Sequence, residues 1–243
     1  MIELKNLTKR FGNTLAVDRL NLSVAKGEIF GFIGPNGAGK TTTIRMLAGV
    51  LAPSEGEVAV NGISMAADPV AAKRSIGFIP DRPFLYEKLT GMEFMRFSAD
   101  LYGVGDGHFR QKAEGLLMRF SLHDWADELI EAYSHGMRQR LVIASALLHA
   151  PRTIIVDEPM VGLDPAGIRL VKDIFRELAR QGTTVFMSTH TLSIAEDLCD
   201  RIGVIHRGRL IATGTTGDLR GTALLAEGDL EEVFLRLTGQ EGP

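Results

Sequence analysis

The sequence predicts an α/β protein with a mainly parallel sheet at its core, and two features carry that prediction. Apolar segments of strand length alternate with helical segments in the second half of the chain, as at 153–156, 166–181 and 183–188. Such alternation is typical of a parallel sheet that helices cover on both faces. Further upstream, an apolar strand at 29–33 leads through a glycine-rich loop into a helix at 42–51.

The segments around that first buried strand predict a second, antiparallel sheet. Residues 2–7 and 20–24 alternate apolar and polar side chains, as half-exposed strands do. Residues 57–60 predict another strand, and Asn61-Gly62 after it is a typical hairpin turn. We therefore expect an antiparallel sheet beside the first strand of the parallel one.

The middle of the chain changes character and predicts a helical insert. Helical spacing runs from about 90 to 125 with a glycine-rich break at 103–107, and a further helix is expected at 137–149, ended by Pro151.

Three parts follow from this pattern. Residues 1–84 with 150–220 are expected to form the core with its antiparallel β subdomain, and 85–149 the helical subdomain. The tail, 221–243, is expected to form an amphipathic helix because apolar residues recur there at i, i+3, i+4 and i+7. The residues with that spacing are Leu230, Val233, Phe234 and Leu237.

Composition bounds the function. A net charge of -3 and a pI near 6.1 argue against nucleic acid as a main partner. The single cysteine, Cys199, excludes an internal disulfide. A helix needs about 20 consecutive apolar residues to span a bilayer, and no uninterrupted apolar run approaches that length. A role at the membrane would therefore depend on a partner.

The segment from Gly34 to Thr41 fits G-x-x-x-x-G-K-[ST], a loop that cradles nucleotide phosphates. Its glycines let successive backbone N–H groups converge on an anion, and the following helix adds partial positive charge. Lys40 is expected to reach the β- and γ-phosphates, and the Thr41 hydroxyl to hold Mg²⁺. The expected nucleotide-binding residues in this region are Asn36, Gly37, Ala38, Gly39, Lys40, Thr41 and Thr42.

Two later strands end in polar residues that suit phosphate chemistry. Asp157 and Glu158 follow an apolar strand, and ligands of open α/β sheets bind beyond the carboxyl ends of the strands. We expect Asp157 to hold Mg²⁺ directly or through water, and Glu158 to polarise an attacking water as general base. His190, at the end of the next strand, is expected to donate a hydrogen bond to the γ-phosphate.

With these residues, two further segments make the chain resemble the ATP-binding subunit of an ABC (ATP-binding cassette) transporter. Tyr133-Ser134-His135-Gly136-Met137 is similar to the family's signature, usually L-S-G-G-Q. Ser134 and Gly136 keep the commonest letters, and the other three residues depart from them. Gly162-Leu163-Asp164-Pro165 resembles its D-loop. The resemblance implies that Ser134, Gly136 and Asp164 contribute to nucleotide binding.

Two other positions take roles only through the resemblance. Phe11 stands where the family stacks an aromatic ring on adenine, with Val17 packing nearby. The family normally has glutamine after the strand at 76–80, where this chain has Asp81. In the family that amide contacts Mg²⁺ and the attacking water and senses the membrane partner. A carboxylate can still bind the metal, at the cost of extra negative charge near the phosphates.

The resemblance implies a P-loop NTPase of ABC type that uses ATP and Mg²⁺. Two copies, or one copy and a paralogous ATPase, would pair head to tail around two ATP molecules and separate after hydrolysis. The partner in the membrane would be a separate permease, which holds the protein at the inner face of the cell membrane in the cytoplasm. Segments 84–90 and 230–239 resemble subunits of export systems, including drug exporters.

Two other classes are less consistent with these motifs. A soluble ABC-type ATPase acting on DNA or ribosomes usually carries a coiled-coil or zinc-binding insertion or a second cassette, and none is seen in this sequence. A small-molecule kinase shares the phosphate loop, but it would not explain Ser134–Met137, Asp164 and His190 in this order.

Overall fold

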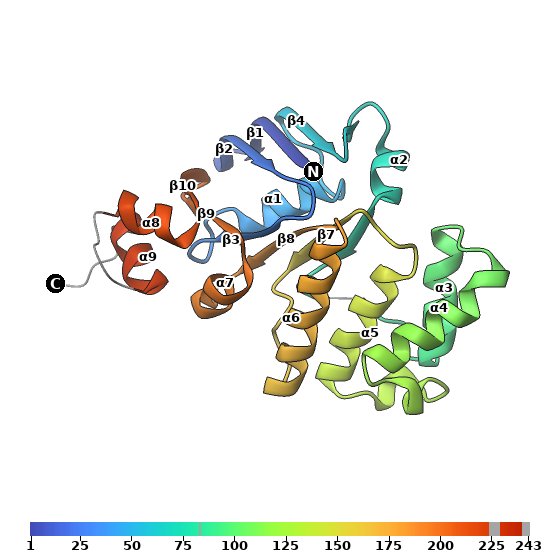
Figure 1. Ribbon diagram of the computed structural model, residues 1–243. Helices are drawn as coiled ribbons and strands as arrows, with labels where there is room; N and C mark the ends of the chain where they lie inside the picture. The colour runs from blue at the N-terminus through green and yellow to red at the C-terminus, as the bar shows by residue number, and fades with distance from the viewer. Residues whose placement is uncertain (83, 224–228, 240–243) are drawn as a thin grey trace.

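The computed structural model describes residues 1–82, 84–223 and 229–239. Its central layer is a six-stranded sheet in the order β10-β9-β3-β8-β7-β6 (Figure 1). Neighbouring strands are parallel except for β9 and β10, which form an antiparallel hairpin at one edge. The predicted mainly parallel core is confirmed. Its strands are β3 (Ile29–Ile33), β6 (Ile76–Ile79), β7 (Thr153–Asp157), β8 (Thr184–Thr189), β9 (Arg201–His206) and β10 (Arg209–Gly214).

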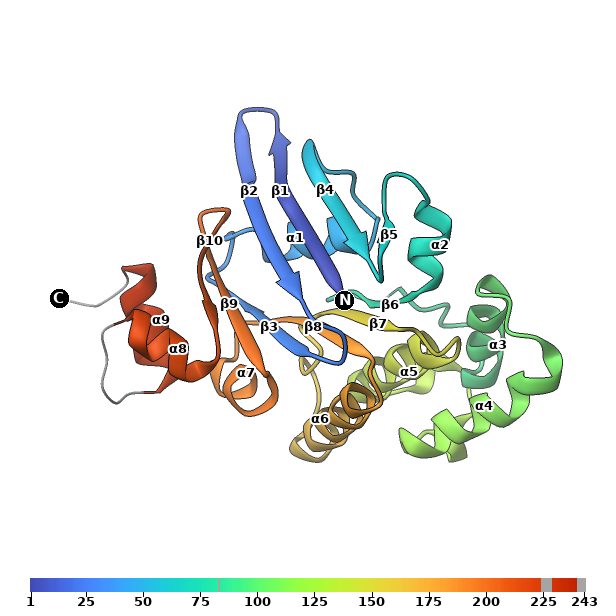
Figure 2. The ribbon, with the colours of Figure 1, turned by 45° about the horizontal axis from the view of Figure 1, so that its top comes forward.

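A second sheet of four antiparallel strands, in the order β2-β1-β4-β5, forms a separate layer (Figure 2). Helix α1 (Lys40–Leu47) lies between the two sheets, where its Ile44 and Leu47 share one core with Val58 of the second sheet and Phe186 of the first. This burial on both sides makes α1 a fixed support for the loop that precedes it. The four strands are β1 (Ile2–Phe11), β2 (Thr14–Val24), β4 (Glu55–Val60) and β5 (Ile63–Ser64).

The predicted hairpin turn is confirmed. Val60 pairs with Ile63, and Asn61 and Gly62 between them have φ of 55° and 79°. A two-residue hairpin loop of this kind requires positive φ at its central residues, which asparagine and glycine adopt most readily.

Helices cover the opposite face of the parallel sheet and extend beyond its edge. Val171 and Phe175 of α6 (Pro165–Arg180) pack in one core with Ile154 and Val185 of the sheet and with buried residues of the neighbouring helices. Figure 1 shows α3, α4 and α5 grouped beside the sheet. The elements of this group are α3 (Gly91–Leu101), α4 (Asp106–Arg119), α5 (His135–Leu147) and the short 3-10 turns His123–Trp125 and Ile130–Ala132.

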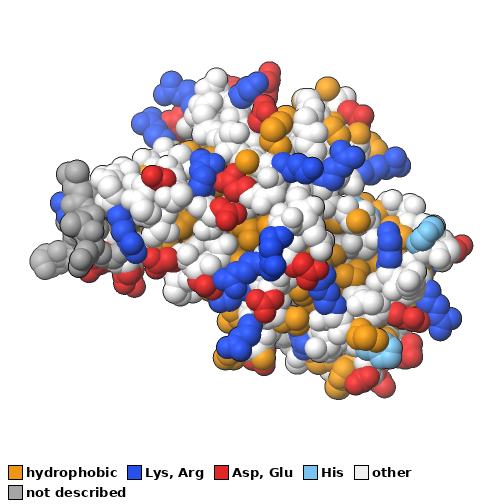
Figure 3. All heavy atoms as spheres, viewed as in Figure 1, with side chains coloured by type: hydrophobic (Ala, Val, Ile, Leu, Met, Phe, Trp, Pro, Cys, Tyr) orange, Lys and Arg blue, Asp and Glu red, His pale blue; other side chains and the backbone are white. Residues whose placement is uncertain are grey.

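The exposed side of α6 carries charges of both signs, visible on the face shown in Figure 3. Lys172 and Arg176 both contact the Asp197 carboxylate, at 2.5 and 2.9 Å, and Glu177 accepts from Arg119 at 2.5 Å. Surface ion pairs of this kind contribute roughly 0–1 kcal/mol each, so the buried apolar face holds the helix in place.

Helix ends differ from the predictions by a few residues for identifiable reasons. Helix α1 begins at Lys40 and ends at Leu47 rather than spanning 42–51, because Gly49 follows with φ of 66°. Helix α5 begins at His135 because the Ser134 hydroxyl accepts the Met137 N–H at 3.2 Å.

Two helices were absent from the prediction, α2 (Pro69–Arg74) and α8 (Thr216–Thr222). Both are short, although Asp68 and Thr215 cap them through side-chain hydrogen bonds. The predicted tail helix is present as α9 (Leu230–Thr238), whose Leu230 and Val233 are buried against α7 (Leu192–Leu198) and β9. Residues 224–228 and 240–243 of the predicted tail segment lie outside the described residues.

A half-buried histidine joins the end of α3 to the core. The rings of His149 and Tyr102 stack with centroids 3.7 Å apart and planes 7° apart, and His149 Nε2 lies 3.0 Å from the Ile76 carbonyl oxygen. Since that oxygen only accepts, Nε2 carries the proton, and Nδ1 is buried with no partner among the described residues. Burial is the main reason that the pKa of His149 is lowered.

We expect His149 to make the protein less stable in mild acid. The unfolded chain, with the ordinary histidine pKa of about 6.5, binds this proton more readily than the folded one, so unfolding becomes easier as the pH falls below that value. His149→Gln should lose less unfolding free energy between pH 7 and pH 5 than the wild type, measured by urea titration. His123→Gln, at an exposed histidine, is the matched control. Equal losses in the wild type and in His149→Gln would contradict this.

Candidate functional site: a nucleotide-sized cavity at the strand ends

A cavity of about 360 Å³ lies beyond the carboxyl ends of β3, β7 and β8. It brings together side chains from the glycine-rich loop and from the ends of two neighbouring strands, as the sequence predicted. The described residues that line it are Ala16, Asn36, Gly37, Gly39, Lys40, Thr41, Thr42, Asp81, Asp157, Glu158, Val161 and His190.

The glycine-rich loop is held where only glycine fits. A Cβ at Gly34 would collide with the Ile205 carbonyl oxygen, and one at Gly39 would lie 2.6 Å from the Ala16 carbonyl oxygen. Gly39 also has φ of 109°, which side chains rarely allow, and it directly precedes α1. The loop is therefore packed tightly against β2 and β9 while its other side faces the cavity.

Lys40 is folded against the loop that carries it. It is 9% exposed, and its Nζ donates to the carbonyl oxygens of Gly34 and Pro35 at 2.6 and 3.2 Å. Burial lowers the pKa of Lys40, and the nearby carboxylates of Glu158 and Asp157 oppose that shift. An ammonium has three N–H donors, so one remains for a phosphate oxygen in the cavity.

Asp157 is a buried carboxylate with a fixed orientation. It is 3% exposed and accepts a hydrogen bond from the Ser188 hydroxyl, which lies beside it because the two residues pair across β7 and β8. Asp157, Asp81 and the Thr41 hydroxyl offer oxygen ligands, the type that Mg²⁺ prefers.

These donors fit Mg²⁺ bound together with a phosphate rather than alone. Within the described part of the chain, no group of three or more His, Cys, Asp or Glu side chains could hold a metal ion. Mg²⁺ at nucleotide sites usually keeps waters and binds one or two carboxylates plus the phosphates. The residues present are sufficient for that mode.

Glu158 directs its side chain to the cavity through an unusual backbone. Its φ is 53°, and its N–H donates to the Ser188 carbonyl oxygen at 3.2 Å. Its Oε1 lies 2.9 Å from His190 Nδ1. Non-glycine residues in this region of φ are strained and are often found at active sites. The pair places a carboxylate beside an exposed imidazole at the mouth of the cavity.

Asp81 lies between two cavities. Besides the one already described, it lines a larger cavity of about 660 Å³ on the side of α5. That second cavity is lined by Asp81, Arg82, Phe84, Leu85, Tyr86, Glu87, Lys88, His135, Arg138 and Gln139.

The other predicted nucleotide residues do not line the first cavity. Ser134 is the exposed N-cap of α5. A Cβ at Gly136 would lie 3.2 Å from the Gly162 carbonyl oxygen, so Gly136 packs on the turn before α6. Asp164 caps α6 by accepting the Gly167 N–H at 2.9 Å.

Phe11 and Val17 also lie outside the cavity lining. Phe11 is half-exposed near the end of the β1–β2 hairpin, with Lys9 Nζ 5.3 Å from its ring centroid. Val17 is fully buried and packs beside Gly39. Their contacts with adenine stay predictions.

Comparison with known proteins decides the family. A family model described as ABC transporter matches residues 17–161. The chain belongs to the ABC transporter family.

The relatives of this ABC protein include several ATP-binding subunits. The linearmycin resistance ATP-binding protein LnrL of Bacillus subtilis is 38% identical over 219 residues, covering 90% of this chain and 70% of that protein. The daunorubicin/doxorubicin resistance ATP-binding protein DrrA of Streptomyces peucetius is 42% identical, covering 91% of this chain and 67% of that protein. A solved ATP-binding subunit of an ABC transporter superposes with a TM-score of 0.92 at 34% identity and covers 98% of this chain and 99% of its own. This chain is an ATP-binding subunit of an ABC transporter.

Three residues of this ABC site escaped the sequence prediction. Ala16 and Val161 line the cavity but have no reactive group to signal it. Ser188 had a signal, since it directly precedes Thr189 and His190 at the end of β8, and the structure shows it bonded to both Asp157 and the Glu158 backbone.

Proposed function

We propose that this ATP-binding subunit hydrolyses ATP with Mg²⁺ and thereby powers export through a separate membrane permease. The single observation that carries the proposal is the arrangement at the strand ends. Glu158, paired with His190, faces the same cavity as Lys40 and the buried Asp157. Phosphoryl transfer needs mainly positioning and charge stabilisation, and these residue types supply both.

The residues take distinct roles in this proposal. Backbone N–H groups of the phosphate loop and the free donor of Lys40 bind the phosphates, and Thr41, Asp157 and Asp81 hold Mg²⁺ directly or through water. Bound Mg²⁺ neutralises charge on the β- and γ-phosphates. Glu158 accepts a proton from the attacking water, and His190 orients Glu158 and contacts the γ-phosphate.

We propose that two copies, or one copy and a paralogous ATPase, pair head to tail around ATP. Two facts support this arrangement. Ser134, Gly136 and Asp164 lie away from the cavity of their own chain, so a second chain must bring them to the nucleotide if they bind it. A solved dimeric cassette in a post-hydrolysis state bound to ADP and Pi is 28% identical to this chain, with a TM-score of 0.78.

The larger cavity is the proposed docking face for the permease. Phe84 is 79% exposed, and its ring meets Tyr86 edge to face with centroids 5.3 Å apart. Tyr86 meets the exposed Phe97 of α3 in the same way, at 5.2 Å. Exposed aromatic clusters of this kind mark interaction sites. The helical subdomain, proposed to span 85–149, would present this face, and Asp81 would connect it to the nucleotide.

Membrane attachment and the direction of transport both depend on the proposed permease. No helix within the described ranges has the length and apolar character needed to cross a bilayer. We propose that the permease holds the protein at the cytoplasmic face of the membrane. Export is supported by the relatives, whose names refer to linearmycin resistance, daunorubicin/doxorubicin resistance and bacitracin transport.

The proposal is tested by phosphate release from purified protein together with the membrane protein that co-purifies with it. We expect Mg²⁺-dependent hydrolysis that stops with EDTA, and a co-purifying polytopic membrane protein. Co-purification with ribosomes or nucleic acid, with no membrane protein, would contradict the transport role. Nucleotide binding without hydrolysis in the presence of that membrane protein would contradict the ATPase role.

Asp81→Gln is expected to keep ATPase activity within about tenfold of the wild type. The amide still offers an oxygen ligand for Mg²⁺. Loss of the negative charge weakens the attraction to Mg²⁺ but also reduces the repulsion of the phosphates, so the two effects on the rate oppose each other. The rate of phosphate release at saturating ATP measures this. A loss near a thousandfold would give Asp81 a catalytic duty that an amide cannot perform, while Glu87→Gln, at an exposed residue of the larger cavity, controls for effects on that cavity alone.

A further inference from the structure

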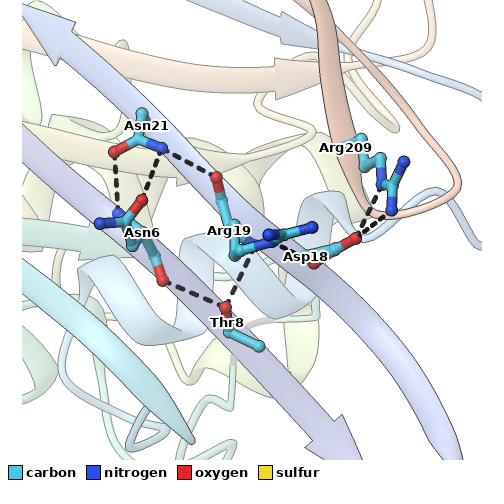
Figure 4. Close-up of polar contacts among 6 residues, drawn as sticks. All are labelled: Asn6, Thr8, Asp18, Arg19, Asn21 and Arg209. Atoms are coloured by element: carbon cyan, nitrogen blue, oxygen red, sulfur yellow. Dashed lines mark hydrogen bonds and ion pairs between the residues drawn. The ribbon is translucent and has the colours of Figure 1, made fainter.

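A polar cluster fixes an irregular stretch of the β1–β2 hairpin (Figure 4). Asn6 and Arg19 have φ of 49° and 45°, and the pairing register shifts on both sides of Leu7. The Asn21 amide of β2 bridges to β1, because its Oδ1 accepts the Asn6 N–H at 2.9 Å and its Nδ2 donates to Asn6 Oδ1 at 3.1 Å. The same Nδ2 donates to the Arg19 carbonyl oxygen within β2 at 2.9 Å. The deformation is therefore held by specific side chains.

Next to this deformation, an ion pair links β2 to β10. Asp18 is 9% exposed, and its Oδ2 accepts from Arg209 Nε at 2.7 Å and contacts Arg209 Nη2 at 2.6 Å (Figure 4). The hydrogen bond from Arg209 is the main reason that the pKa of Asp18 is lowered, so this carboxylate stays charged at neutral pH.

The turn before Arg209 connects that ion pair to the phosphate loop. The Gly208 N–H donates to the Ala38 carbonyl oxygen at 2.9 Å, and the Gly208 carbonyl oxygen accepts the Asp18 N–H at 2.9 Å. A Cβ at Gly208 would lie 2.9 Å from the Ala16 carbonyl oxygen, so the turn is also packed on the cavity wall. One turn thus touches both the loop and the wall of the nucleotide cavity.

We propose that the Asp18–Arg209 ion pair positions the phosphate loop and the Ala16 wall for nucleotide binding. Neither side chain lines the cavity, so the pair acts through the Gly208 turn and its bonds to Ala38 and Asp18. A site held in its binding geometry before the ligand arrives loses less freedom on binding, and affinity rises. The inference rests on ATP as the occupant of this cavity.

Arg209→Ala and Asp18→Asn test this by calorimetric titration with ATP, well below the melting temperature of each variant. Each is expected to raise the Kd for ATP roughly five- to tenfold. This corresponds to part of the free energy that a charge-assisted hydrogen bond contributes. The turnover number should stay within about twofold, since the catalytic groups are untouched. The Kd of the double variant should equal that of either single variant, because each single substitution already removes the same ion pair.

Arg19→Ala is the matched control. Arg19 Nε also contacts the Asp18 carboxylate, at 3.3 Å, but Arg19 is exposed, and within the described residues it makes no hydrogen bond to the Gly208 turn. We expect its Kd for ATP to equal that of the wild type. An unchanged Kd in Arg209→Ala, or an equal rise in Arg19→Ala, would overturn the inference alone. A wild-type protein that binds no ATP would overturn the assignment of the cavity as well.

Discussion

Glu158→Gln is expected to abolish ATP turnover, with a loss of at least about a hundredfold, and to leave ATP binding intact. A glutamine keeps the size and hydrogen-bonding reach of the side chain but cannot accept a proton from water, and general-base catalysis contributes about 10²–10⁴-fold. The Oε1 that loses this function lies 2.9 Å from His190 Nδ1, so the amide retains a partner there. Phosphate release and ATP titration measure the two effects separately.

A second glutamate separates this effect from a general loss of charge. Glu55 is exposed on β4 and lies outside the cavity lining, so Glu55→Gln should hydrolyse ATP at the wild-type rate. Full residual hydrolysis by Glu158→Gln would remove Glu158 from the role of base. Loss of both hydrolysis and binding would mean that Glu158 holds the site together rather than activating water.

Lys40→Ala is expected to weaken ATP binding by roughly ten- to a hundredfold. The change removes a positioned ammonium whose charge-assisted hydrogen bond to phosphate is worth about 1.5–3 kcal/mol. It also frees the carbonyl oxygens of Gly34 and Pro35, which Lys40 holds at 2.6 and 3.2 Å, so the loop loses two internal contacts. A calorimetric titration with ATP gives the change in Kd.

Lys26→Ala is the control for this variant, since Lys26 is exposed on the turn before β3 and does not line the cavity. Its affinity for ATP should be unchanged. An unchanged affinity in Lys40→Ala, with the protein still folded by circular dichroism, would contradict the assignment of Gly34–Thr41 as the phosphate loop.

The parts of the site that the sequence predicted are local or follow from strand order. The loop from Gly34 to Thr41 is a contiguous motif, and its close packing explains its glycines. Asp157 and His190 come together because their strands, β7 and β8, are parallel neighbours whose carboxyl ends meet at one edge. A pattern of apolar strands ending in polar residues is sufficient to predict both.

The parts that the sequence did not predict depend on contacts between distant segments. Asp18 and Arg209 meet only because the hairpin β9–β10 ends against β2, and no local pattern marks either residue. The positive φ of Glu158 is likewise set by its neighbours on β8 rather than by its own preference. Short helices such as α2 escape because so few residues give little periodicity.

The signature residues are predicted to contact ATP that is held by a second molecule, so a single chain does not show that contact. Ser134 is exposed at the start of α5, and its hydroxyl serves as the N-cap. If ATP joins two copies, a negative charge at Ser134 should repel the terminal phosphate held by the other copy. Aspartate is as good an N-cap as serine, so Ser134→Asp adds that charge while keeping the helix start, and Ser134→Asn is its neutral counterpart.

The molecular mass of Glu158→Gln with ATP, measured by sedimentation, tests most directly whether ATP joins two copies of this protein. The mass should double on adding ATP, and it should double in Glu158→Gln with Ser134→Asn as well. With Ser134→Asp added instead, the protein should still bind ATP but remain a monomer. A Glu158→Gln protein that binds ATP and stays monomeric, or a Ser134→Asp form that dimerises as readily, would contradict the pairing of two copies of this protein around ATP.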